Sequence, residues 1–224
     1  MYFLVDEEKQ VIFGWSPKCG CSHIKKLFWF LKLNDLNHTI HTSREMKRLP
    51  ENVKDYTIIM IVRNPFKRVV SGFLDKYRQG GEYRYKWKGS TITFSAFVEE
   101  LIKGSWTVVD SHHFKPQTDE YYNEKVFDAK VLKCFDLENI DYKYIESLYD
   151  VKIPKDFLSK KHGHERSKTG TILSIPVYDL NMSEYYTSNV NYSYFYNEEL
   201  REKVSKFFQK DFELFEKFGF KYTI

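Results

Sequence analysis

The sequence predicts an α/β fold in which helices flank a central parallel sheet. Short apolar runs alternate with stretches of helical periodicity along its 224 residues. The run 56–62 is rich in β-branched and apolar residues, as a strand covered on both faces is. Because no repeat, low-complexity tract or linker rich in Pro, Gly or Ser divides the chain, we expect one domain over residues 1–224.

The first half of the chain predicts two strand–helix pairs. The apolar run Val11–Trp15 is expected to form a strand, which a Ser-Pro pair ends. A helix follows, since apolar side chains recur at i, i+3, i+4 and i+7, at Ile24, Leu27, Phe28 and Leu31. After the strand at 56–62, Asn64 can cap a second helix and Pro65 can take its first position.

The second half continues the alternation with longer gaps. Helices are expected at 94–103, 140–149 and 198–218, with a strand at 130–135. Asn197 can cap the last of these helices and Gly219 can end it. Two segments, 79–92 and 159–174, contain glycine and basic residues without a regular period, and we expect them to be loops.

The charge balance limits the class of partner. Lys plus Arg number 35 and Asp plus Glu number 31, which gives a net charge of +4 at pH 7. So small an excess argues against a nucleic-acid partner, but it leaves room for a local anion site.

Cysteine content and hydropathy indicate the compartment. The three cysteines are too few, and odd in number, for a disulfide framework, which favours a reducing compartment. The aliphatic run 58–62 is far shorter than the roughly 20 residues of a membrane-spanning helix. The first ten residues are partly acidic and do not have the shape of a signal peptide. We therefore expect a soluble, cytoplasmic protein with no transmembrane segment.

The junction between the first strand and the first helix has the chemistry of an anion site. A tight loop there points backbone N–H groups and the helix dipole at one spot, where a phosphate or sulfate group fits. Glycine permits a positive φ, lysine adds a mobile cation and serine adds a hydroxyl. The candidate binding residues are Pro17, Lys18, Cys19, Gly20, Cys21 and Ser22. An ordinary turn with a surface lysine is the alternative.

This loop does not match two better-known patterns. In the phosphate-binding pattern GxxxxGK[ST] the glycines stand closer together than Gly14 and Gly20, and lysine, not Cys21, precedes the hydroxyl residue. A Cys-x-Cys-x-His zinc site lacks the usual Cys-x₂-Cys geometry, and no second pair of ligands follows. We therefore expect no metal.

The junction after the strand at 56–62 is also basic. Arg63 stands at the end of this strand, outside the carboxyl edge of the sheet, where α/β folds bind ligands. Arg68 and Ser71 are i, i+3 on the next helix, on the face opposite its apolar stripe, so a guanidinium and a hydroxyl can bind one phosphate together. The alternative is that Arg68 is simply solvated.

Together the two junctions resemble the sulfotransferases, most closely the carbohydrate sulfotransferases that use 3′-phosphoadenosine 5′-phosphosulfate (PAPS). PKCGCS is similar to the 5′-phosphosulfate loop of that family, and VRNPFKRVVSGF to its 3′-phosphate motif, R-x-P-x-x-R-x-x-S. HHFKPQT, VLKCFDLEN and KDFELF also look like the family, so the resemblance runs from about residue 11 to residue 218. It implies a P-loop-like three-layer sandwich, PAPS as the donor, and Arg63, Arg68 and Ser71 as ligands of the 3′-phosphate.

Sulfuryl transfer would need an in-line attack, a stabilised leaving oxygen and a base for the acceptor hydroxyl. Lys18 would stabilise the bridging oxygen, and a sulfuryl group carries too little charge to require a metal. A histidine suits the base, because its ordinary pKa of about 6.5 lies near neutrality. His41, just upstream of the strand at 56–62, stands where similar sulfotransferases place their base and is the first candidate. His113 is the second.

The acceptor is expected to be a hydroxyl-bearing molecule, which the resemblance indicates to be a glycan or another small molecule. Residues 80–89 interleave aromatic and basic side chains, which suits a sugar with acidic groups and equally suits a solvated loop. Two other functions remain as alternatives. A P-loop-type kinase would show magnesium-dependent ATP turnover, and a non-catalytic nucleotide-binding module would bind adenosine 3′,5′-bisphosphate without transfer.

Overall fold

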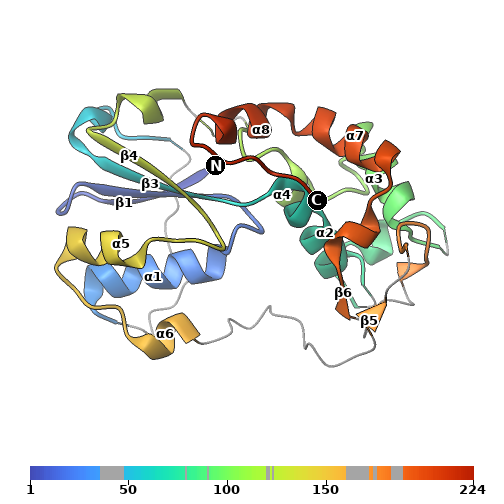
Figure 1. Cartoon of the computed structure of the whole chain (residues 1–224), viewed down its shortest axis with the longest axis horizontal. Coiled ribbons are helices and arrows are strands. Elements are labelled where there is room, and N and C mark those ends of the chain that lie inside the picture. Colours follow the sequence, from blue (N-terminus) through green and yellow to red (C-terminus); the bar gives the residue numbers. More distant parts are fainter. Residues whose placement is uncertain are drawn as a thin grey trace. The chain divides into compact units, whose positions relative to one another are not determined.

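The structure is a computed structural model that describes residues 1–35, 48–78, 80–89, 91–119, 122, 124–159, 172–173, 176–182 and 189–224. The chain divides into two compact units, one from Met1–Arg63 and Gln117–Glu165 and the other from Asn64–Pro116 and Arg166–Ile224. Figure 1 labels most helices and strands of both units. The expectation of one domain over residues 1–224 stays a prediction.

A four-stranded sheet forms the centre of the first unit. Its order is β1 (Tyr2–Asp6), β2 (Val11–Trp15), β3 (Thr57–Val62) and β4 (Val131–Asp136). Strands β2, β3 and β4 are parallel, so their carboxyl ends lie at one edge. Strand β1 pairs antiparallel with β2, an edge strand that the sequence patterns did not predict. The predicted α/β fold, with a mostly parallel sheet flanked by helices, is confirmed.

Helices α1 (Cys21–Leu33) and α5 (Tyr142–Tyr149) cover one face of this sheet (Figure 1). The side chains of α1 that recur with helical period are the buried ones, and they share a core with Phe13 of β2 and Ile59 of β3. Every side chain from Ile58 to Val62 is fully buried, as expected of a strand covered on both faces. The unit also contains α6 (Lys155–Ser159), η2 (Val53–Asp55) and η4 (Glu124–Asp128).

The second unit is mainly helical around an aromatic core. Its helices are α2 (Pro65–Lys76), α3 (Phe94–Ile102), α4 (Ser111–Phe114), α7 (Glu198–Phe207) and α8 (Gln209–Glu216). Two 3₁₀ turns, η3 (Arg84–Lys86) and η6 (Tyr192–Phe195), and two short parallel strands, β5 (Ile172–Leu173) and β6 (Asn189–Val190), complete it. Phe73, Tyr77 and Phe97 contact one another at the centre of the core. Within the described segments, no helix is both long and apolar enough to cross a membrane.

Local chemistry sets the predicted helix starts. The Asn64 side chain accepts a hydrogen bond from the N–H of Phe66, and Pro65 occupies the first position of α2. The Asn197 side chain caps α7 in the same way, at the N–H of Leu200. Both caps were predicted, because an Asn side chain replaces the partner that a helix start lacks.

One predicted helix is two helices. The segment expected to be continuous from 198 to 218 breaks at Phe208, whose φ of −101° and ψ of 21° leave the helical region. Adjacent residues of a helix point about 100° apart, so Phe207 and Phe208 cannot both face the core from a straight helix. The break leaves Phe208 fully buried while Phe207 packs, half-buried, against the same core.

Candidate functional site

The predicted anion loop connects β2 to α1 in the first unit. A turn is closed by the N–H of Cys19, which donates to the carbonyl of Ser16 at 3.0 Å. Lys18 has a φ of 67°, an uncommon conformation for a residue with a side chain. Gly20 has a φ of 75°, and a Cβ there would lie 2.5 Å from Cδ1 of Leu137. Position 20 therefore requires glycine for two reasons, backbone conformation and close packing.

The start of α1 is open to an anion. Its N-cap, Gly20, has no side chain that could accept a hydrogen bond, and the first turn contains no acidic residue. Within the described part of this unit, six buried side-chain atoms have no hydrogen-bond partner, and two of them, Oγ of Ser16 and Nε of Arg63, belong to this loop and to the residue that contacts it. Buried polar groups are normally paired, so these two atoms fit a bound anion. The N-terminal dipole of the 13-residue helix also favours a negative charge.

Arg63, which the sequence places at the second junction, contacts this loop. It directly follows β3, and its Nη1 donates to the carbonyl of Lys18 at 2.9 Å. Because β2 and β3 are parallel neighbours, the residues after both strands lie at the same edge of the sheet. The structure thus brings Lys18, Gly20 and Arg63 together within the first unit.

Gln117 is the residue of this site that sequence reasoning missed. Its side chain is fully buried and bonds the main chain of Arg63 twice, with Oε1 accepting from the N–H at 3.1 Å and Nε2 donating to the carbonyl at 2.9 Å. The thiol of Cys19 donates to the same Oε1 at 2.9 Å. Gln117 therefore links the anion loop to Arg63. The segment HHFKPQT pointed to this region, but nothing in its pattern assigned the amide a role.

The remaining predicted donor ligands lie in the second unit, on α2. Arg68 and Ser71 are one turn apart, as predicted, and Ser71 is half-buried. The alternative that Arg68 is simply solvated is wrong, because only 2% of its surface is exposed. Its Nη1 donates to the carbonyl of Lys115 at 2.9 Å, which fixes the guanidinium inside the unit.

His113, the second candidate base, lies on α4 of the second unit. Its Nδ1 is 2.5 Å from Oδ2 of Asp110, a buried carboxylate. Burial works against the charge of Asp110, but the hydrogen bond and charge of His113 outweigh it and keep the pKa of Asp110 below its ordinary value. His41, the first candidate, lies outside the described residues.

Two other predicted features have structural roles in the described chain. His23, of the rejected zinc pattern, lies 2.7 Å from the hydroxyl of Tyr142 and packs on Phe157. In the loop 80–89, Tyr83 and Trp87 pack against the aromatic core, whereas Tyr85 is 78% exposed. The loop therefore presents one aromatic side chain outward beside its basic residues.

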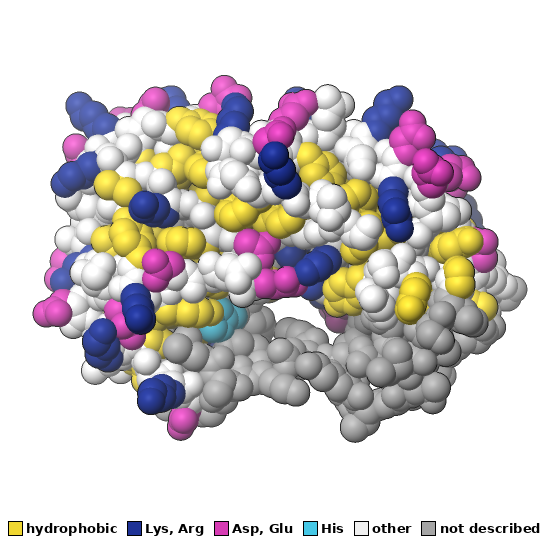
Figure 2. Space-filling model, in the orientation of Figure 1, with side chains coloured by type: hydrophobic (Ala, Val, Ile, Leu, Met, Phe, Trp, Pro, Cys, Tyr) yellow, Lys and Arg dark blue, Asp and Glu magenta, His cyan; other side chains and the backbone are white. Residues whose placement is uncertain are grey.

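On one face of the protein, charges of both signs are interspersed among the described residues. On the face shown in Figure 2, Lys and Arg side chains alternate with Asp and Glu side chains. This agrees with a net charge of +4 and directs attention to local sites for anion binding.

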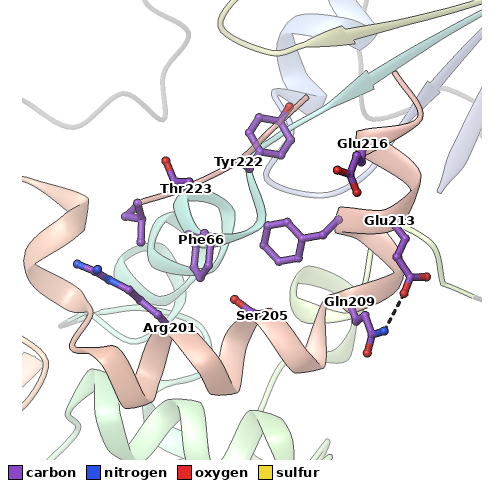
Figure 3. Close-up of a pocket in the computed structure, with 10 residues that line it drawn as sticks. Phe66, Arg201, Ser205, Gln209, Glu213, Glu216, Tyr222 and Thr223 are labelled. Atoms are coloured by element: carbon purple, nitrogen blue, oxygen red, sulfur yellow. Dashed lines mark hydrogen bonds between the residues drawn. The ribbon is translucent and has the colours of Figure 1, made fainter. Parts of the chain in front are cut away.

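The second unit also has a pocket of about 510 Å³ (Figure 3). Phe66 and Tyr222 line it, with Arg201 on one side and Glu213 on the other, where Gln209 donates to Glu213 at 2.7 Å. None of its lining residues is a predicted site residue, and they include neither histidine nor lysine. The predicted groups for sulfuryl transfer thus do not line this pocket.

Comparison with known proteins identifies relatives of this chain. A family model described as the sulfotransferase family matches residues 1–219. The chain is 30% identical over 102 residues to carbohydrate sulfotransferase 8 of Homo sapiens, covering 39% of the chain and 24% of the relative. It is 26% identical over 148 residues to carbohydrate sulfotransferase 9 of Homo sapiens, covering 54% and 33%. With carbohydrate sulfotransferase 11 of Rattus norvegicus it shares 31% over 94 residues, covering 35% and 27%.

These alignments thus span no more than a third of each relative's length. No solved structure matches the chain.

Proposed function

Because the chain belongs to the sulfotransferase family, we propose that it transfers a sulfuryl group from PAPS to a hydroxyl of a carbohydrate. The family match over residues 1–219 supports the reaction class. Relatives that are carbohydrate sulfotransferases support the class of acceptor.

The observation that carries this proposal is the open loop between β2 and α1. The buried Oγ of Ser16, which has no partner among the described residues, and an uncapped helix start suit the oxygens of a phosphosulfate, and the Nε of Arg63, also without a partner there, suits the 3′-phosphate. Lys18 is the proposed partner of the oxygen that bridges sulfur and phosphorus, where negative charge develops as the bond breaks. Arg63, Arg68 and Ser71 are the proposed ligands of the 3′-phosphate, because charge-assisted hydrogen bonds favour Arg for phosphate.

The proposed sulfuryl transfer needs no reactant besides PAPS and the acceptor. The acceptor oxygen attacks sulfur, the bond from sulfur to the 5′-phosphate oxygen breaks, and adenosine 3′,5′-bisphosphate leaves with the electron pair. The acceptor proton passes to a histidine, and His41 and His113 are the candidates. Charge on the sulfuryl group is low enough for Lys18 and backbone N–H groups to stabilise the transition state.

Transfer of ³⁵S from labelled PAPS to a panel of p-nitrophenyl glycosides and small alcohols tests the proposal, with mass spectrometry of the product. We expect a sulfated glycoside, and loss of transfer in Lys18→Ala but not in Lys9→Ala, an exposed lysine of the β1–β2 turn. Bisphosphate binding without transfer to any hydroxyl would instead identify a nucleotide-binding module. Magnesium-dependent ATP turnover would identify a kinase.

A further inference from the structure

Asp110 and His113 form a pair that the proposed reaction has not yet used. Asp110 caps the short helix α4, and its Oδ1 accepts a hydrogen bond from the N–H of His112 at 3.0 Å. Its other carboxylate oxygen, Oδ2, lies 2.5 Å from Nδ1 of His113. Only 5% of the Asp110 side chain is exposed, against 20% of the His113 side chain. The carboxylate is therefore buried while the ring remains partly accessible.

The backbone of this pair is held from several sides. The hydroxyl of Tyr77 accepts a hydrogen bond from the N–H of Asp110 at 3.3 Å and donates to the carbonyl of Val108 at 2.8 Å. Burial raises the pKa of Tyr77 far above its ordinary value, so this hydroxyl keeps its proton. A fixed carboxylate beside an imidazole determines which ring nitrogen carries the proton.

Helix α4 is also fixed against α2, the helix that carries two proposed donor ligands. A Cβ at Gly72 would lie 2.6 Å from the ring of Phe114, so only glycine allows this approach. At the next residue, the carbonyl of Lys115 accepts from Nη1 of Arg68. Two contacts directly after His113 thus join its segment to α2, one at Gly72 and one at Arg68.

Other charged groups face this pair. Lys76 and Glu82 form an ion pair of 2.6 Å, and Lys76 acts on Asp110 and Glu82 on His113 through their charges. The ring of His112 lies 4.8 Å from the ring of His113. Lys76 and Glu82 have opposite charges and largely offset each other, so Asp110 is the main electrostatic partner of His113.

We propose that Asp110 is a positioning residue that keeps the proton of neutral His113 on Nδ1, and that Nε2 of His113 takes the proton of the acceptor hydroxyl. As this hydroxyl oxygen bonds to sulfur, its proton moves to Nε2, and the carboxylate of Asp110 stabilises the imidazolium that forms. This inference rests on the proposed function. It names His113, not His41, as the base.

Asp110→Asn separates this role from capping. Asn caps a helix about as well as Asp, but it carries no charge and its amide can donate to Nδ1, which favours the wrong tautomer. We expect kcat to fall at least about 10²-fold. We expect the acid limb of the kcat–pH profile to move to lower pH, because the imidazolium loses its counter-charge. KM for PAPS and the melting temperature should stay near the wild-type values.

Asp141→Asn is the matched control, because Asp141 caps α5 through the N–H of Tyr144 and pairs with no histidine among the described residues. Its kcat and pH profile should match the wild type. His113→Ala should have a much lower kcat than the wild type, and added imidazole should restore part of it. His112→Ala should keep the wild-type kcat. Near-normal kcat in Asp110→Asn or in His113→Ala, with collapse in His41→Ala, would overturn the proposal.

Failure of this inference differs from failure of the proposed function. Absence of sulfuryl transfer by the wild-type protein, to any acceptor of the panel, would refute the function. ¹⁵N NMR of the histidine rings at neutral pH shows which ring nitrogen of His113 carries the proton. This measurement does not depend on enzymatic activity. We expect His113 to carry its proton on Nδ1 in the wild type and to lose this preference in Asp110→Asn, and a wild-type ring protonated on Nε2 alone would refute the pair.

Discussion

Replacing Gln117 with leucine should damage both the fold and the donor site. The substitution removes a buried carboxamide and leaves the N–H and carbonyl of Arg63 without their partner, along with the thiol of Cys19. An unsatisfied buried group costs about 1–3 kcal/mol, so the two main-chain groups together should cost roughly 2–6 kcal/mol. For a chain of this size that loss corresponds to a fall in Tm of roughly 4–24 °C.

The same substitution frees Arg63, so affinity for adenosine 3′,5′-bisphosphate should fall as well. Thermal unfolding followed by circular dichroism and calorimetric titration with the bisphosphate measure the two effects. Gln209→Ala is the control, because Gln209 is exposed on α8 and bonds only Glu213 in the described structure. A Gln117→Leu protein with the wild-type Tm and bisphosphate affinity would refute the reasoning.

Gln117→Glu adds a pH test of the same contact. A carboxylate in place of the amide would face the carbonyl of Arg63 without a proton to donate, and burial favours its neutral form. The pKa of the new carboxyl is therefore raised in the folded state above its unfolded value of about 4.3. Stability relative to the wild type should be greatest below that value and should decrease as pH rises through the folded-state pKa. A deficit in Tm that does not change with pH would contradict this prediction.

Three further predictions concern the donor site. Lys18→Ala should lower kcat more than donor affinity, since the charge of Lys18 acts mainly on the transition state. Steady-state kinetics that showed only a raised KM would make Lys18 a simple binding residue. The protein should bind adenosine 3′,5′-bisphosphate at least about tenfold more tightly than AMP, because each charge-assisted hydrogen bond to the 3′-phosphate contributes about 1.5–3 kcal/mol. Equal affinities by calorimetry would argue against a 3′-phosphate site. Gly20→Ala should lower Tm more than Gly80→Ala. The two glycines share a φ near +75°, but only at Gly20 would the new Cβ meet a side chain, that of Leu137. Equal losses in Tm would show that this contact is unimportant.

Elements that depend on neighbouring residues were predictable from sequence. The strand Val11–Trp15, the helix after it and the caps at Asn64 and Asn197 follow from periodicity and from hydrogen bonds over two or three residues. The positive φ of Gly20 before the start of α1 was predictable for the same reason, because it depends on the glycine itself. The break at Phe208 was not predictable in this way, because the aromatic core, and not the helix itself, decides which of two adjacent phenylalanines is buried.

The contacts of the candidate site needed the tertiary structure. Gln117 reaches Arg63 across 54 positions of sequence and Cys19 across 98, and no local pattern encodes a hydrogen bond between such distant residues. The burial of Arg68 is likewise decided by Lys115, which the chain brings over α2 from outside that helix. Asp110 and His113 are only three residues apart, yet their contact depends on a short helix with no periodicity of its own. The sequence by itself thus determined which residue types stand at the two junctions after β2 and β3, and packing between distant segments decided which side chains keep them in place.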